Sequence, residues 1–118
     1  MSHQEISNIV VIGSGKLGTD IFYYLLEFDF RLSLICIDEE EAEKQKAFFQ
    51  KRINRQLKTG MIDDQRLQFL QESVCIDYNY EMIPECDLII ECIWENKLQK
   101  QKLFKAIVPF LNNRFILF

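Results

Sequence analysis

The chain has 118 residues, the length of one domain, and 48% of them are hydrophobic, which is enough for a core. A net charge of −4 and the lack of any basic cluster in the sequence argue against a nucleic-acid-binding surface. The apolar runs are too short to span a membrane, and the polar residues 1–7 do not resemble a secretory signal, so we expect a cytoplasmic protein.

The first half of the chain predicts strands and helices in alternation, over residues 8–12, 16–28, 32–37 and 39–58. The first strand is rich in β-branched residues and stops at Gly13, and the second is an apolar run closed by Asp38. The first helix has apolar residues at helical spacing. The second consists of helix formers in which acids precede bases, and Gly60 should end it.

The second half predicts a helix over residues 63–72, strands over residues 73–76 and 87–92, a helix over residues 96–111 and a strand over residues 114–118. Asp63 or Asp64 should cap the first of these helices, and Pro109 should bend or end the second. Residues 77–86 are predicted to form a loop. Near-continuous apolar strands between helices are typical of an α/β protein. We therefore expect a mainly parallel sheet with helices on both faces, in three layers, and a single domain over residues 1–118.

The first predicted strand leads into the sequence G-x-G-x-x-G, where the first predicted helix begins. Gly13 permits the tight turn, Gly15 lets a pyrophosphate approach the backbone, and Gly18 lets the helix pack closely on the sheet. Free N–H groups at the helix start would bind the phosphates. In this context the pattern predicts a Rossmann-type, doubly wound dinucleotide-binding domain, rather than a turn that merely needs glycines. The candidate cofactor-binding residues of this loop are Gly13, Ser14, Gly15, Lys16, Leu17 and Gly18.

An acid at the end of the second predicted strand completes the pattern. Asp38 lies 20 positions after Gly18, where a carboxylate that accepts hydrogen bonds from the adenosine ribose is expected. A carboxylate there repels a 2′-phosphate, and residues 39–41 are all glutamates with no arginine among them. The sequence therefore predicts NAD rather than NADP as the cofactor.

The cysteines do not predict a metal site. No two of them have C-x-x-C spacing, and His3 is the only histidine in the sequence. We expect free thiols used as small core residues, because disulfides do not suit a cytoplasmic chain. These cysteines are Cys36, Cys75, Cys86 and Cys92.

Three stretches resemble the N-terminal NAD-binding domain of the 3-hydroxyacyl-CoA dehydrogenase family. They are VVIGSGKLG at residues 10–18, LICID at residues 34–38 followed by a long helical pair, and DLIIECIWEN at residues 87–96 with Lys100 after it. The third stretch is the specific one, since many dehydrogenases share the glycine loop. The resemblance covers nearly the whole chain and implies an enzyme that oxidises the 3-hydroxyl of a hydroxyacyl-CoA to a ketone and passes hydride to NAD.

The resemblance also implies roles for residues outside the glycine loop. Trp94 replaces a residue that is usually proline or small, and could stack near the ribose or narrow the pocket. Glu95 and Lys100 fall where the family contacts NAD, although they could instead form a surface pair at a helix start. The further cofactor-binding candidates are Ile93, Trp94, Glu95 and Lys100, and the weaker candidates for the CoA part of the substrate are Asn54 and Lys58.

Other positions depart from the family pattern. Leu17 stands where the family often has methionine, and Asp29 stands where a glycine commonly ends the first helix. The family's catalytic histidine and glutamate lie beyond the position where this sequence stops. We therefore expect a domain truncated after the fifth strand, with no catalytic residue, that binds NAD without turning over substrate. Residues 115–118 would form an apolar edge strand and promote self-association.

Two alternatives to this interpretation stay open. One is a stand-alone, non-catalytic NAD-binding or regulatory module, which the missing catalytic residues favour. The other is a related β-hydroxyacid dehydrogenase, whose helix after the second strand is usually shorter than the insertion over residues 39–72.

Overall fold

The computed structural model describes residues 6–81, 86–92, 98, 101–102 and 105, and the backbone of residues 115–117. The strands and helices follow one another along these residues in the predicted order. The elements are β1 (Asn8–Ile12), α1 (Lys16–Leu25), β2 (Arg31–Ile35), α2 (Glu39–Lys58), α3 (Asp64–Ser73), β3 (Val74–Asp77), β4 (Leu88–Glu91) and β5 (Phe115–Leu117).

The strands form one sheet in the order β3-β2-β1-β4-β5, and all of its pairs are parallel. Ile12, at the carboxyl end of β1, is in register with Ile35 of β2 and Glu91 of β4. The chain proceeds outward from β1 in both directions, so β1 is the topological switch point where an open α/β sheet binds ligands. The predicted parallel α/β architecture is confirmed.

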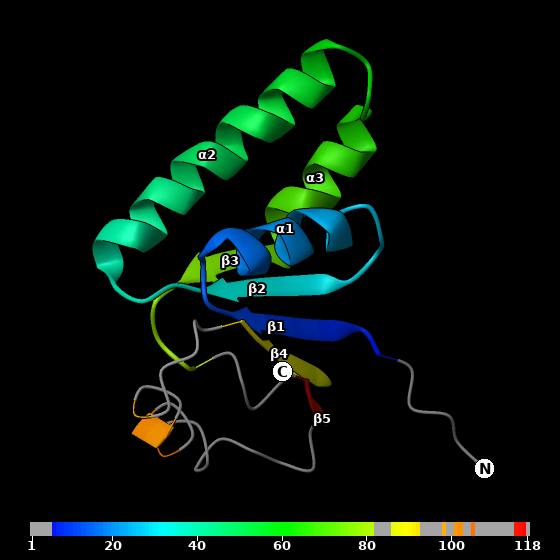
Figure 1. Ribbon diagram of the computed structural model, residues 1–118. Helices are drawn as coiled ribbons and strands as arrows, with labels where there is room; N and C mark the ends of the chain where they lie inside the picture. Colours follow the sequence, from blue (N-terminus) through cyan, green and yellow to red (C-terminus); the bar gives the residue numbers. More distant parts are fainter. Residues whose placement is uncertain are drawn as a thin grey trace, which may run out of the picture.

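Helices α1, α2 and α3 lie together on one face of the sheet (Figure 1). The hydrophobic core lies between these helices and the sheet. Val11, Leu34 and Phe22 in this core are completely buried. Val10 and Ile89 are also buried although they are not part of this cluster, as expected of parallel strands covered on both faces. The helix predicted over residues 96–111 lies mostly outside the described residues. Its described members, all helical, are Leu98, Gln101, Lys102 and Lys105.

The first helix is shorter than predicted, because the chain after α1 is held by a distant arginine. Arg66 of α3 donates from one guanidinium nitrogen to the carbonyls of Leu26 (2.7 Å) and Phe28 (2.6 Å). Its other terminal nitrogen pairs with Asp29 at 2.5 Å. These bonds hold the chain in a turn after Leu25. Asp29, which replaces a glycine expected from the sequence resemblance, therefore has a partner in Arg66.

Several strand boundaries also differ from the prediction by one or two residues, and two of these differences have a visible cause. β2 ends at Ile35 instead of residue 37, because Ile37 leaves the sheet and is 81% exposed. β3 begins one residue late, because Ser73 still belongs to α3 and its hydroxyl donates to the Phe69 carbonyl. Within the part of the chain that is described, no helix has both the length and the apolar character needed to cross a bilayer.

Candidate dinucleotide-binding site

The loop between β1 and α1 turns at a glycine that no other residue replaces easily. Gly13 has φ = 109°, a left-handed conformation that L side chains rarely adopt. Its N–H donates to the Ile35 carbonyl at 2.9 Å, which continues the β1–β2 pairing by one residue. The turn therefore starts directly at the carboxyl edge of the sheet, as predicted for Gly13.

Gly18 is required for close packing, and the structure shows against what. A Cβ at this position would lie 1.8 Å from the Gly13 carbonyl oxygen and 3.4 Å from the Cβ of Cys92. The sequence predicted close packing of the helix on the sheet. The tightest contact is in fact with the loop itself, so Gly18 fixes how closely α1 folds back on the turn.

Gly15 differs from both, because nothing within the chain requires a glycine there. It is the N-cap residue of α1 with φ = −71°, and a Cβ would meet no atom within 4 Å. No side chain caps α1, and its first turn has no acidic residue. The amides of Lys16, Leu17 and Gly18 in that turn have no partner within the helix. An extended backbone open to solvent beside these amides fits a diphosphate, and a side chain would hinder its approach.

The side chains of the other loop residues have surroundings of their own. Burial raises the pKa of the Cys36 thiol, and the nearby Ser14 side chain partly opposes this rise. Lys16 pairs with Asp20 at 3.2 Å on the helix surface, and Leu17 is 63% exposed. With its side chain paired to Asp20, Lys16 would contact the phosphates through its backbone.

Asp38 has a structural role that the sequence pattern did not predict. It lies exposed where β2 passes into α2, and its Oδ1 accepts a hydrogen bond from the Glu41 N–H at 2.9 Å. Asp38 is therefore the N-cap of α2, and this bond uses one of its two carboxylate oxygens. An aspartate followed three positions later by a glutamate resembles a capping box and could have revealed the cap.

Glu91, at the carboxyl end of β4, was missed as an individual residue because it lies in an apolar stretch. It is 3% exposed, and its neighbour Cys92 donates its N–H to the Ile12 carbonyl at 2.8 Å. A buried acid therefore lies in the strand beside the end of β1. The predicted residues that follow it, Ile93, Trp94 and Glu95, and also Lys100, lie outside the described residues.

The two candidates for CoA binding do not join the glycine loop. Asn54 and Lys58 are exposed in the last third of α2, and Asn54 accepts a hydrogen bond from Gln50 at 3.1 Å. Asn54 is sixteen residues beyond Asp38, which at 1.5 Å per residue is about 24 Å along the helix. The structure therefore separates them from the dinucleotide site, and only an extended ligand could reach both.

The cysteines are free, with Cys36 and Cys86 buried and Cys75 and Cys92 half-buried. Burial raises the thiol pKa of Cys36, Cys75 and Cys92. Among the residues that the structure describes, no group of three or more potential ligands is placed to hold a metal ion.

Fold and loop together define a Rossmann-type dinucleotide-binding domain. The family model described as "3-hydroxyacyl-CoA dehydrogenase, NAD binding domain" matches residues 8–118, so the chain belongs to this family and its cofactor is NAD.

Relatives and solved structures agree with this membership. A "Putative fatty acid oxidation complex trifunctional enzyme" of Rickettsia felis is 26% identical over 96% of this chain and 16% of its own length. A "Probable 3-hydroxybutyryl-CoA dehydrogenase" of Bacillus subtilis is 25% identical over 87% of this chain and 36% of its own. The fold matches the crystal structure of (S)-3-hydroxybutyryl-CoA dehydrogenase from Ralstonia eutropha with a TM-score of 0.77 at 18% identity. That match covers 95% of this chain and 40% of the other. The chain thus spans well under half the length of these proteins.

Proposed function

We propose that this chain is the cofactor-binding part of an NAD-dependent 3-hydroxyacyl-CoA dehydrogenase. The observation that carries the proposal is the uncapped start of α1 at Gly15, where neither backbone conformation nor packing requires a glycine. A bound diphosphate explains that glycine, because it must approach the backbone closely to accept hydrogen bonds from the first amides of α1. NAD, when bound, accepts a hydride from the 3-carbon of the hydroxyacyl-CoA.

Asp38 orients the adenosine end of the cofactor. Its position after β2, the strand that pairs with β1, supports a contact between its second carboxylate oxygen and the ribose hydroxyls. Three glutamates follow in the first turn of α2 and add negative charge beside this position. The charge disfavours the 2′-phosphate of NADP, which supports selection of NAD.

The remaining contacts follow from the family resemblance. We assign the nicotinamide side of the cofactor to Ile93, Trp94, Glu95 and Lys100, which follow β4 in the sequence. The CoA part of an acyl-CoA substrate would lie along the exposed side of α2, toward Asn54 and Lys58. The parallel register of β1 and β4 supports the first assignment, because it brings the chain after Glu91 to the same edge as Gly13.

This polypeptide alone should bind NAD without oxidising a hydroxyacyl-CoA. Its only histidine, His3, precedes β1 in the sequence, whereas the glycine loop follows β1. We therefore assign the chain binding and orientation of the cofactor, and assign proton transfer to a segment such as the longer relatives contain.

Calorimetric titration with NAD and NADP tests the cofactor assignment, and NADH oxidation in the presence of acetoacetyl-CoA tests catalysis. We expect NAD to bind at least about tenfold more tightly than NADP, a difference of about 1.4 kcal/mol, and no turnover above background. Equal affinity for the two cofactors would contradict the role of Asp38. Clear turnover would show that the chain holds its own catalytic base.

A further inference from the structure

Glu91 is the only buried acid among the residues that the structure describes. It is 3% exposed at the carboxyl end of β4, although a carboxylate loses favourable hydration when it is buried. Ile12 of β1 is in register with Glu91 on one side and with Ile35 of β2 on the other. Ile35 is apolar and 2% exposed, so this level of the sheet accommodates an apolar side chain. Packing alone therefore does not explain an acid at the end of β4.

The side chain of Glu91 belongs to the face of the sheet opposite to α1. Leu88, Ile90 and Cys92 pack against the core cluster on the α1 side. Side chains alternate between the two faces of a strand, so Glu91 shares the other face with the completely buried Ile89. Burial raises the pKa of the Cys92 thiol, and the negative charge of Glu91 adds to this rise. Glu91 therefore brings a negative charge into the interior, directly below the edge where the strands end.

The order of the strand ends gives this charge a place along the cofactor. Gly13 follows β1 and Asp38 comes after β2, and the proposed function assigns them to the diphosphate and to the adenosine ribose. β4 adjoins β1 on the side away from β2. A dinucleotide that runs from Asp38 across the glycine loop would therefore continue over the end of β4, with its nicotinamide half toward Glu91.

The two oxidation states of the cofactor differ in charge only at the nicotinamide. The oxidised ring of NAD carries a positive charge, whereas the ring of NADH is neutral because it has accepted a hydride. A charge in the interior acts more strongly on its surroundings than an exposed charge does. The glutamates of residues 39–41 lie on the adenosine side, where NAD and NADH are identical, so they do not distinguish the two forms.

We propose that Glu91 makes this domain bind NAD more tightly than NADH, because its buried carboxylate attracts the positively charged nicotinamide ring. This inference rests on the proposed function, since it needs a cofactor that crosses the edge of the sheet from Asp38 toward β4. The attraction is lost when the ring accepts a hydride, so Glu91 retains the oxidised cofactor and favours release of the reduced one. Glu91 is thus a specificity-determining residue that acts through its charge.

Calorimetric titration of wild type and Glu91→Gln with NAD and NADH tests the proposal, because glutamine keeps the shape of the side chain and removes its charge. We expect wild type to bind NAD at least about threefold more tightly than NADH. Glu91→Gln should weaken NAD binding by about fivefold and leave NADH affinity within about twofold of wild type. A merely structural role would weaken both cofactors by the same factor, and that result would overturn the proposal.

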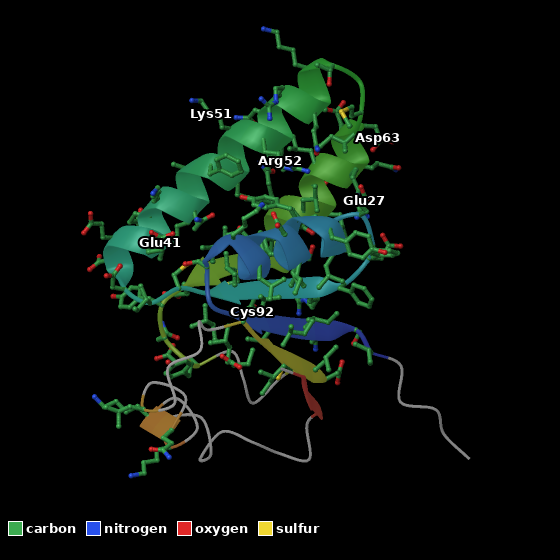
Figure 2. The ribbon with its side chains drawn as sticks, in the orientation of Figure 1. Glu27, Glu41, Lys51, Arg52, Asp63 and Cys92 are labelled. Atoms are coloured by element: carbon green, nitrogen blue, oxygen red, sulfur yellow. The ribbon has the colours of Figure 1, made fainter. Side chains whose placement is uncertain are left out.

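Two further variants and one ligand isolate the charge. Glu27→Gln is the matched control, since it removes an exposed negative charge and should keep both affinities. Figure 2 shows Glu27 on the side of the sheet opposite to Cys92, which marks the strand ends. Glu91→Asp keeps the charge and should keep the preference for NAD. ADP-ribose has no nicotinamide, so wild type and Glu91→Gln should bind it equally.

The outcomes separate this inference from the proposed function. If wild type binds none of the three ligands, both are overturned. If wild type binds them but prefers NADH, or if Glu91→Gln keeps the wild-type ratio of NAD to NADH affinity, the cofactor site stands and the role of Glu91 is overturned. Circular dichroism shows whether Glu91→Gln is folded. Should it fail to fold, the preference of wild type and of Glu91→Asp for NAD over NADH decides the question.

Discussion

Helices α1, α2 and α3 begin in two different ways. α2 starts with Asp38, whose carboxylate accepts the Glu41 N–H at 2.9 Å, and α3 starts with Asp63, which accepts the Arg66 N–H at 2.8 Å. α1 starts at Gly15, with no capping side chain and no acid in its first turn. Aspartate is among the best N-cap residues, so the chain stabilises two helix ends internally and omits this from the third. The omission supports the proposal that this end binds the diphosphate of NAD.

The largest expected effect is on the fold, and it separates two glycines of the same loop. Gly18→Ala should lower the free energy of unfolding by about 3 kcal/mol, because its Cβ would lie 1.8 Å from the Gly13 carbonyl oxygen. Gly15→Ala, whose Cβ meets nothing within 4 Å, is the matched control and should not lose stability. Urea denaturation measures both, and equal stability of the two variants would contradict the packing role of Gly18.

The second prediction gives α1 a capping aspartate such as α2 and α3 have. Gly15→Asp should supply the missing cap, and we expect stability to rise by a few tenths of a kcal/mol. The new carboxylate would occupy the approach of the diphosphate and repel it, so NAD affinity should fall at least about a hundredfold, or about 2.7 kcal/mol. Thermal unfolding and calorimetric titration give the two values. NAD affinity within threefold of wild type would show that the phosphates bind elsewhere.

A smaller effect distinguishes the two capping aspartates. Asp38→Ala and Asp63→Ala each remove a cap bond of almost equal length, so each should cost about 1 kcal/mol of stability. Only Asp38→Ala should also weaken NAD binding, by about tenfold, because it removes a charged hydrogen-bond acceptor for the ribose. Parallel denaturation and titration of the two variants provide the comparison. Equal NAD affinity in both would reduce Asp38 to a structural cap.

The smallest effect isolates the charge of Asp38 from its capping function. Asparagine is as good an N-cap as aspartate, so Asp38→Asn should keep stability within a few tenths of a kcal/mol. The loss of one negative charge should narrow the preference for NAD over NADP by about threefold, since residues 39–41 remain acidic. Titration with both cofactors measures this change, and an unchanged ratio would assign the selectivity to the glutamates.

Features encoded by neighbouring residues could be predicted from the sequence. The bounds of β1 and α2 were correct, because a β-branched run ended by glycine and a run of helix formers are local signals. The glycine loop could also be predicted, because the spacing of its glycines indicates both the turn and the start of the helix. The end of α1 could not be predicted, because it depends on Arg66, which lies about forty positions away in the sequence.

The residues of the candidate site could be predicted from the sequence, but the contacts of their side chains could not. Asp38 was identified by its spacing from Gly18, but its bond to Glu41 depends on the angle at which α2 leaves β2. Ser14 was predicted as a cofactor contact, while its influence on the thiol of Cys36, which follows a different strand, was not predicted. Such pairs are decided by packing in three dimensions, for which spacing along the chain is no guide.

The bonds of Arg66 have a consequence for how this domain assembles. One guanidinium binds two carbonyls and a carboxylate of the turn that joins α1 to β2, and its flat face covers the ring of Phe69 at 4.8 Å. The turn is therefore held in its shape by a side chain of α3, so the first βαβ unit depends on a helix that follows it in the sequence. A lysine has no planar fork to satisfy three acceptors at once, so the inserted helical pair is joined to the nucleotide-binding half by a residue that no other cation replaces.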